Sequence, residues 1–332
     1  MTLLVWTWTF ILAIAVAFYV LLDGFDLGVG ILFGVAPAEH RPVMMNSISP
    51  TWDGNETWLV LGGIGLLAAF PLAFAIIIPA VYIPLLIMLL ALVFRGVAFE
   101  FRFHEPWLRR FWDRAFCIGS AVATFAQGLV LGSFIQGYKV EGRAFAGGPF
   151  DWLTPFSLTI GVALMFGYAL LGAGWLIIKT EGALQDWARR AARICLIAVV
   201  VAIAVVSLWT PLAYEAIRAR WFSWPNIVLF SPVPVIVVAL AWIEWRALRN
   251  GRELTPFACS IGLFLMSFLG LAISLWPMVV PPRYTLSDAA SSASTQSFLL
   301  IGTLILLPII LFYTGWSYWV FRGKVRADAG YH

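Results

Sequence analysis

The sequence predicts an all-α integral membrane protein with nine transmembrane helices. Of its 332 residues, 62% are hydrophobic and only 11% are charged, whereas soluble domains usually carry about 25% charged residues. Nine apolar runs are long enough to cross the roughly 30 Å hydrocarbon core of a bilayer. The basic residues fall mainly on one side of these runs. Together these observations exclude a disordered chain, a disulfide-rich secreted domain and a nucleic-acid-binding protein.

The nine predicted helices form one polytopic domain over residues 1–332. They lie near residues 5–34, 57–74, 77–95, 115–136, 156–178, 192–212, 224–243, 257–277 and 298–320. The second and third come from one uncharged stretch, residues 57–94, which as a single helix would be about 57 Å long. Because this is nearly twice the bilayer thickness, we expect the chain to fold back around Pro71 to Pro79. The seventh run has the weakest pattern, since it contains Pro232 and Pro234.

The distribution of basic residues predicts the orientation. An odd number of helices places the termini on opposite sides, and 16 of the 21 basic residues then share the side of the C-terminus. The positive-inside rule therefore predicts an N-terminus outside and a C-terminus in the cytoplasm. The basic excess faces anionic lipid headgroups rather than nucleic acid. The first run has no basic residue before it and no cleavage site after it, so we expect it to be retained.

Acidic residues beside the first helix are the first candidate functional groups, because charges in membrane helices are costly. Asp23 and Asp26 share a face if their segment is helical, since they are three residues apart. Gly24 and Gly28 form a G-x-x-x-G pair that permits close helix packing. Two interpretations stay open: the acids carry protons from the cytoplasm, or they pair with arginines at an interface while the glycines pack.

The second and third helices carry further charges. Asp53 and Glu56, between Trp52 and Trp58, have the spacing of a helix-capping box, so capping and proton carriage fit this spacing equally well. Arg95 closes the third helix and is the base placed to neutralise an acid of the first two. Its alternative is to extend toward lipid headgroups.

Groups for redox chemistry are missing from the predicted helices. The histidines, His40, His104 and His332, all lie outside them, so none could ligate a haem iron within the membrane. The three cysteines are isolated in apolar runs and form no C-x-x-C motif. The chain by itself therefore lacks the parts for redox catalysis.

Five blocks of the sequence resemble subunit II of the cytochrome bd quinol oxidases. They comprise residues 23–30, 46–59, 94–102, 276–292 and 307–319, in the order that the family has them. Any one block alone would be weak evidence for the family, but the joint order of the five is specific. The resemblance covers the whole chain. The short loops are similar to the compact, cyanide-insensitive type of this subunit.

The resemblance implies two four-helix bundles plus one helix, packed against subunit I in a heterodimer in the bacterial cytoplasmic (inner) membrane. Subunit I of the family carries two haem b and one haem d and oxidises quinol, whereas subunit II ligates no haem. A structural quinone in subunit II and a small accessory transmembrane subunit are further expectations, with membrane lipid as a partner and no nucleic acid.

The resemblance also implies roles for individual residues. Asp53 is expected to feed protons from the cytoplasm toward haem d, along a path with Glu56, Asp26 and Asp23. The residues expected at the subunit interface, where they support the haems, are Trp52, Asp26, Gly28, Trp58, Arg95 and Glu100. Glu100 stands where other members have Asp. A proton-coupled secondary transporter is the alternative function, and a purely structural stabiliser of subunit I is a third.

Overall fold

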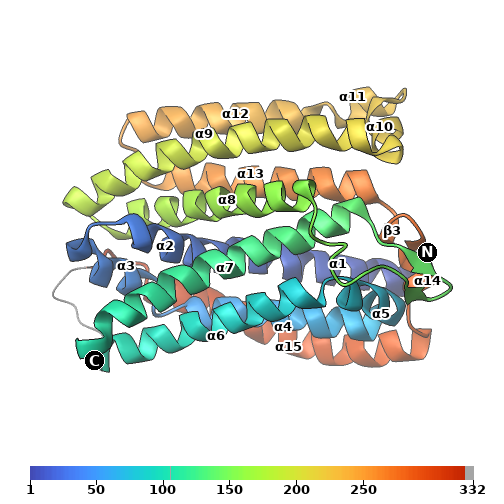
Figure 1. The fold of residues 1–332 in the computed structure, drawn as a ribbon, viewed down its shortest axis with the longest axis horizontal. Helices are drawn as coiled ribbons and strands as arrows, with labels where there is room; N and C mark the ends of the chain where they lie inside the picture. Colours follow the sequence, from blue (N-terminus) through green and yellow to red (C-terminus); the bar gives the residue numbers. More distant parts are fainter. Residues whose placement is uncertain (105, 326–332) are drawn as a thin grey trace.

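Long α-helices run side by side along one axis of the molecule (Figure 1). This is a computed structural model that describes residues 1–104 and 106–325. Eight segments of the described residues are long and apolar enough to cross a membrane. They are Leu3–Val35, Tyr82–Arg102, Arg109–Gln136, Pro155–Lys179, Gly182–Ala213, Asn226–Arg249, Leu254–Leu275 and Ala293–Val320. The predicted all-α membrane class is therefore confirmed.

The first spanning segment is interrupted by a π-helical turn. It consists of α1 (Leu3–Phe18), the π-helical turn η1 (Tyr19–Asp23) and α2 (Gly24–Val35). The helix thus continues to about residue 34, as predicted. A short 3₁₀ turn, η2 (Ala38–His40), and α3 (Arg41–Ile48) follow and return the chain toward the next long helix.

The uncharged stretch of residues 57–94 folds back as predicted. It belongs to α4 (Trp52–Ala69), α5 (Pro71–Ala80) and α6 (Tyr82–His104), and the breaks fall at Phe70 and Val81. Trp52 at the start of α4 stacks on Phe99 near the end of α6, so the two helices are antiparallel. Helix α4 is not among the eight apolar segments, because its first two turns hold Asp53, Asn55 and Glu56.

The remaining elements complete the bundle. They are η3 (Pro106–Leu108), α7 (Arg109–Gln136), β1 (Val140–Glu141), β2 (Ala144–Phe145), α8 (Pro155–Lys179), α9 (Gly182–Ala213), α10 (Glu215–Phe222), α11 (Asn226–Phe230), α12 (Pro232–Arg249), α13 (Leu254–Leu275), β3 (Met278–Val280), β4 (Tyr284–Thr285), α14 (Leu286–Ala289) and α15 (Ala293–Val320). The strands form two small antiparallel hairpins, with Val140 opposite Phe145 and Met278 opposite Thr285. Pro232 lies in the first turn of α12, where a proline is tolerated.

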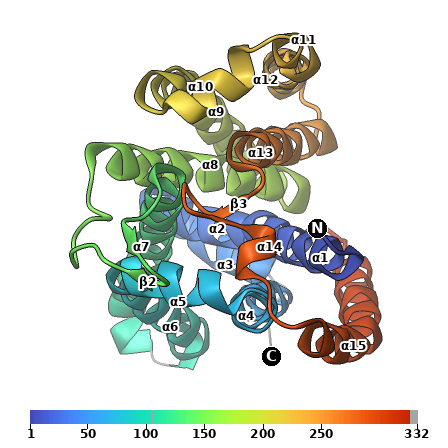
Figure 2. The same ribbon diagram turned by 90° about the vertical axis from the view of Figure 1, so that its right-hand side faces the viewer.

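Helix α8 lies at the centre of the packing and contacts α2, α7, α9 and α13. On one side of it, α9, α12 and α13 pack together, and on the other α2, α6 and α7 do so (Figure 2). Helix α15 lies at the edge and contacts α1 and α4. The main core surrounds buried aromatic side chains such as Phe25, Phe33 and Tyr168.

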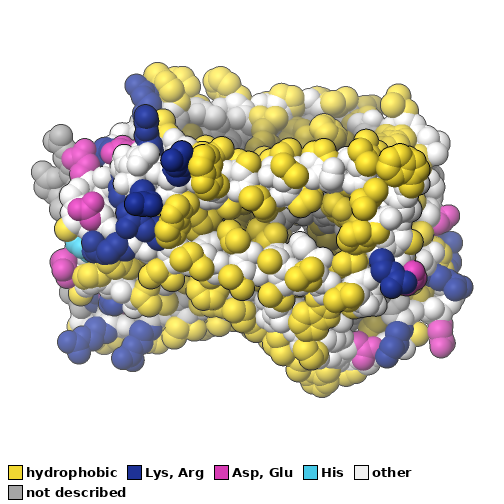
Figure 3. All heavy atoms as spheres, turned by 90° about the horizontal axis from the view of Figure 1, so that it is seen from above, with side chains coloured by type: hydrophobic (Ala, Val, Ile, Leu, Met, Phe, Trp, Pro, Cys, Tyr) yellow, Lys and Arg dark blue, Asp and Glu magenta, His cyan; other side chains and the backbone are white. Residues whose placement is uncertain are grey.

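The surface is apolar along the helices and charged at the two ends. Figure 3 shows hydrophobic side chains over the length of the molecule, with Lys and Arg gathered mainly at the left-hand end. We call this the basic end. Here Arg41 pairs with Asp113, and Lys324 pairs with Glu253. Lys179, the last residue of α8, bonds the backbone carbonyls of Phe321 and Gly323 just after α15.

Candidate functional site

Arg95 joins carboxylates from two other helices inside the bundle. Its Nη1 atom donates to Asp23 Oδ1 at 3.0 Å and to Glu56 Oε1 at 2.6 Å. The side chains of Arg95 and Asp23 are fully buried, and that of Glu56 is 25% exposed. Arg95 thus neutralises acids of the first two predicted helices, as expected, and does not extend toward headgroups. We call Asp23, Asp26, Glu56 and Arg95 the buried charge cluster.

Aromatic rings cover the guanidinium. Trp52 and Phe99 stack with centroids 4.7 Å apart and planes inclined by 4°. The guanidinium carbon of Arg95 lies 5.9 Å from the centroid of each ring. A cation at this range is attracted by the ring faces. The rings therefore stabilise the buried charge while excluding water from one side of it.

Asp26 is held by an amide rather than by a cation. Asn55 Nδ2 donates to Asp26 Oδ2 at 2.7 Å, and Asn55 Oδ1 accepts from the Tyr318 hydroxyl at 2.9 Å. Asp26 is fully buried, and its Oδ1 has no hydrogen-bond partner among the described residues. This chain of contacts joins α2, α4 and α15 around one carboxyl group.

A second polar chain leads to Asp23. The Tyr168 hydroxyl donates to Gln127 Oε1 at 2.8 Å, and Gln127 Nε2 donates to the Tyr19 oxygen at 2.7 Å. The Tyr19 hydroxyl faces the Asp23 carboxylate, whose Oδ2 has no hydrogen-bond partner among the described residues. Sequence analysis missed these three residues. The available signal was Gln127, an amide in the apolar part of its helix.

The cluster contains more acids than bases. It holds three carboxyl groups and one guanidinium, which bonds two of them, so the set is neutral only when two of the carboxyls bind protons. Burying an uncompensated charge costs several kcal/mol or more, and a buried group neutralises instead. The arrangement can therefore hold and exchange protons inside the bundle.

The other predicted residues lie outside this cluster. Asp53 is exposed in the first turn of α4 and Glu100 is exposed on α6. Trp58 is buried and packs against Phe18, with centroids 4.7 Å apart. The capping-box interpretation is wrong, because Thr51 occupies the N-cap of α4 without a side-chain bond, and Glu56 reaches Arg95 instead.

Gly28 lies where α2 crosses α8 of the same chain. A Cβ atom at this position would lie 1.7 Å from the Tyr168 carbonyl oxygen, and one on Gly172 would lie 2.4 Å from the Val29 nitrogen. The glycines thus permit close helix packing, as their spacing predicted. Any influence of Gly28 on a partner subunit is indirect, because it is buried within this chain.

Glu244 is a buried acid that sequence analysis did not single out. It is 1% exposed in α12, and its Oε1 accepts from the Ser260 hydroxyl of α13 at 2.8 Å. No cation pairs with it among the described residues. The signal was its place directly after an apolar run that ends at Ile243.

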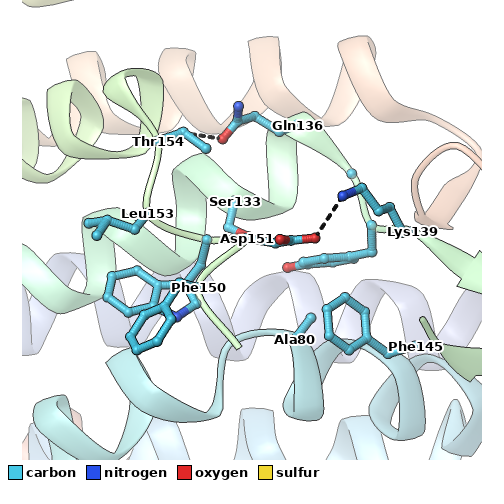
Figure 4. A pocket seen from close by; sticks show the side chains of 12 residues that line it. Ala80, Ser133, Gln136, Lys139, Phe145, Phe150, Asp151, Leu153 and Thr154 are labelled. Atoms are coloured by element: carbon cyan, nitrogen blue, oxygen red, sulfur yellow. Dashed lines mark hydrogen bonds and ion pairs between the residues drawn. The ribbon is translucent and has the colours of Figure 1, made fainter. Parts of the chain in front are cut away.

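A cavity of about 380 Å³ lies between the end of α7 and the start of α8 (Figure 4). Its walls include Phe145, Phe150 and Thr154, and no member of the buried charge cluster. Lys139 pairs with Asp151 at its rim, at 3.1 Å. Hydrogen bonds from Lys139 and from the Gly148 backbone lower the pKa of Asp151.

Metal-binding potential is low in the part of the chain that the structure describes. Within residues 1–104 and 106–325, no group of three or more His, Cys, Asp or Glu side chains could hold a metal ion.

Comparison with known proteins identifies the family. The family model described as cytochrome bd terminal oxidase subunit II matches residues 4–321. The chain is 29% identical to "Cytochrome bd-I ubiquinol oxidase subunit 2" of Escherichia coli (strain K12), covering 97% of this chain and 95% of that protein. It is also 29% identical to "Cytochrome bd ubiquinol oxidase subunit 2" of Bacillus subtilis (strain 168), covering 96% of each.

The fold has a solved counterpart. The structure of the bd oxidase from Geobacillus thermodenitrificans matches with a TM-score of 0.78 at 17% identity, covering 96% of this chain and 99% of that one. Together with the eight apolar segments, the relatives make this a multi-pass protein of the bacterial inner membrane. The chain belongs to the cytochrome bd terminal oxidase subunit II family and is the second subunit of a quinol oxidase complex.

Proposed function

We propose that this chain supplies the cytoplasmic proton path for oxygen reduction and supports the haem-bearing subunit I. The observation that carries the proposal is the buried charge cluster, in which Asp23 and Glu56 bond one guanidinium and Asp26 is buried with only an amide as its partner. The Asp53 side chain is exposed one turn before Glu56 on α4, so it can receive a proton from outside the bundle. Membership of the family removes the transporter alternative, since it places the chain in an oxidase complex.

The membrane topology follows from treating α4 as a ninth crossing. Its 18 residues span about 27 Å, close to the hydrocarbon thickness, and it is antiparallel to α6. The first bundle then comprises α1 with α2, α4, α6 and α7, and the second comprises α8, α9, α12 and α13. Helix α15 is the additional helix. The basic end faces the cytoplasm, and the N-terminus is periplasmic.

The proposed path begins at the basic half of the bundle. A proton from cytoplasmic water binds Asp53 and moves to the Glu56 carboxylate, which is partly exposed and bonds Arg95. From there it moves inward toward Asp26, which is fully buried, with Asp23 beside both. Trp52 and Phe99 keep water from the guanidinium, so the proton passes between the carboxyl groups and not to water. The path continues in subunit I, where oxygen reduction consumes the proton.

The haems are proposed to lie in subunit I. No histidine lies within the eight apolar segments, so these helices offer no imidazole ligand at membrane depth. Two haem b and one haem d in subunit I would supply electron transfer and oxygen reduction. Quinol, membrane lipid, a structural quinone in this chain and a small accessory transmembrane subunit complete the proposed set of partners. Trp52, Trp58 and Glu100 support the subunit contact.

The test compares two variants of the assembled complex. Asp53→Asn and Glu56→Gln remove a proton-binding group with little change in shape, and we expect quinol oxidase turnover to fall on the order of 100-fold. Haem content should stay that of the wild type. Glu181→Gln is the matched control, because Glu181 is an exposed acid of the α8–α9 connection.

A purely structural role predicts a different result. In that case each variant would lose turnover only in proportion to lost haem or lost subunit I. Normal turnover in both variants, with full haem content, would show that neither acid conducts protons.

A further inference from the structure

Asp23 differs from the other acids of the cluster in its surroundings. Its carboxylate and the Arg95 guanidinium are both fully buried and 3.0 Å apart. Asp26 contacts the neutral amide of Asn55, and Glu56 is partly exposed. Only Asp23 therefore has its charge compensated by a cation entirely inside the protein.

The polar chain behind Asp23 has a direction. A carboxylate can only accept hydrogen bonds, and the Tyr19 hydroxyl is the neutral donor that faces Asp23. The Tyr19 oxygen then accepts from Gln127 Nε2, and Gln127 Oε1 accepts from the Tyr168 hydroxyl, as found at 2.7 and 2.8 Å. Both bonds are donated toward Tyr19, so the Tyr19 hydroxyl proton is left free for Asp23. Taking a proton from Asp23 would require Gln127 to turn over and both hydroxyls to reverse.

The backbone reinforces this arrangement. Tyr19 and Asp23 are the first and last residues of the π-helical turn in the first spanning segment. Such turns are rare inside α-helices and occur frequently at functional sites. Tyr168 is fixed from the other side, because its ring packs against the backbone at Gly24. The donors are thus held in place by η1, α7 and α8.

We propose that Asp23 is the fixed negative counter-charge of Arg95, and that Tyr19, Gln127 and Tyr168 are positioning residues that keep it ionised. The inference rests on the proposed function and deepens it, since it leaves Asp26 and Glu56 as the carboxyls that exchange protons. The titratable and charged groups facing Asp23 are Tyr19, Asp26, Glu56, Arg95, Tyr168 and Tyr318. Arg95 is the only cation in this set.

The charge balance of the cluster follows directly. The charges of Asp23 and Arg95 cancel, so the cluster as a whole is neutral when Asp26 and Glu56 each hold a proton. When either proton leaves toward subunit I, one buried negative charge remains, and this charge draws the next proton from the cytoplasm. Asp23 neither gains nor loses a proton during the cycle.

Infrared spectroscopy of the purified complex tests the assignment, because a protonated carboxyl has a C=O stretch that a carboxylate lacks. We expect the wild-type C=O signals to be reduced in Asp26→Asn and Glu56→Gln. Asp23→Asn leaves Arg95 without its counter-charge, so Glu56, which bonds Arg95, should ionise and lose its signal while the Asp26 signal stays. Tyr19→Phe removes the donor to Asp23 and should create a new C=O signal. That signal should be missing when Tyr19→Phe is combined with Asp23→Asn. Tyr138→Phe is the matched control, a buried tyrosine outside the cluster.

Two results would overturn the proposal. One is a wild-type C=O signal that stays in both Asp26→Asn and Glu56→Gln but disappears in Asp23→Asn, and the other is a Tyr19→Phe spectrum identical to that of the control. Should Asp23→Asn fail to assemble, the comparison of Tyr19→Phe with Tyr138→Phe still decides the matter. The proposed function fails separately, through normal turnover in Asp53→Asn and Glu56→Gln, since the infrared signals do not depend on turnover.

Discussion

Arg95 Nη1 lies 3.0 Å from Asp23 Oδ1, and neither side chain is exposed. Removing one partner of a buried ion pair leaves an uncompensated charge, which typically costs on the order of 3–5 kcal/mol. We therefore expect Arg95→Gln to lower the yield and thermal stability of the complex strongly. Arg95→Lys should be intermediate, because an ammonium keeps the charge but cannot reproduce the geometry of a guanidinium. Arg249→Gln, at an exposed arginine of α12, is the control.

The crossing of α2 and α8 gives a second prediction. Gly28→Ala would place its Cβ 1.7 Å from the Tyr168 carbonyl oxygen, so the helices must separate. Overpacking of this kind typically costs about 1–3 kcal/mol, and the shift would also disturb the chain from Tyr168 to Tyr19. Thermal unfolding of the detergent-solubilised complex measures this loss of stability.

Gly63 is the matched control for Gly28. It lies in α4, and an added Cβ would have no neighbour within 4 Å. Gly63→Ala should leave the melting temperature unchanged or raise it slightly, since alanine favours a helix by about 1 kcal/mol over glycine. Equal melting temperatures for the two variants would contradict the close crossing.

The sequence predicted the spanning helices well because their signal is local. Twenty apolar residues in a row, a glycine pair or a fold-back between two prolines can each be recognised without knowing the neighbours. The start of α4 was misplaced by the same reasoning. The charges of Asp53 and Glu56 favour a helix that begins after them. The sequence does not show that Arg95, from another helix, bonds Glu56 and so allows the helix to begin earlier.

The site was predicted in part. Asp23, Asp26, Glu56 and Arg95 stand out as charges near apolar runs, and they meet in the fold. Tyr19 and Tyr168 do not stand out, because a tyrosine in a membrane helix is ordinary. Their role depends on two contacts of Gln127. One joins it to Tyr168, 41 positions away, and the other to Tyr19, 108 positions away. Such pairings are set by helix packing that no local pattern encodes.

Glu244 allows a prediction about the second bundle. It is buried with the Ser260 hydroxyl as its partner and has no cation beside it among the described residues. A neutral carboxyl and an amide have nearly the same size and hydrogen-bonding capacity, so Glu244→Gln should change stability by less than about 1 kcal/mol. Glu244→Lys should prevent assembly, because a buried cation would replace a neutral group.

Thermal unfolding and the amount of assembled complex measure both Glu244 variants. A large loss of stability in Glu244→Gln would mean that Glu244 is ionised in the complex and paired with a cation of another subunit.

The loop of residues 137–154 should loosen in acid. The bond from Lys139 lowers the pKa of Asp151 in the folded protein, so this contact stabilises the loop above the unfolded value of about 3.9. The stabilisation is lost as the pH falls through the lowered pKa. Hydrogen exchange of the loop amides should therefore be faster in Asp151→Asn than in the wild type at neutral pH. The difference should shrink as the pH falls below about 3.9 and vanish below the lowered pKa of Asp151. The effect is small because the pair is exposed and screened by salt. A difference that persists in strong acid would show that Asp151 acts through shape rather than charge.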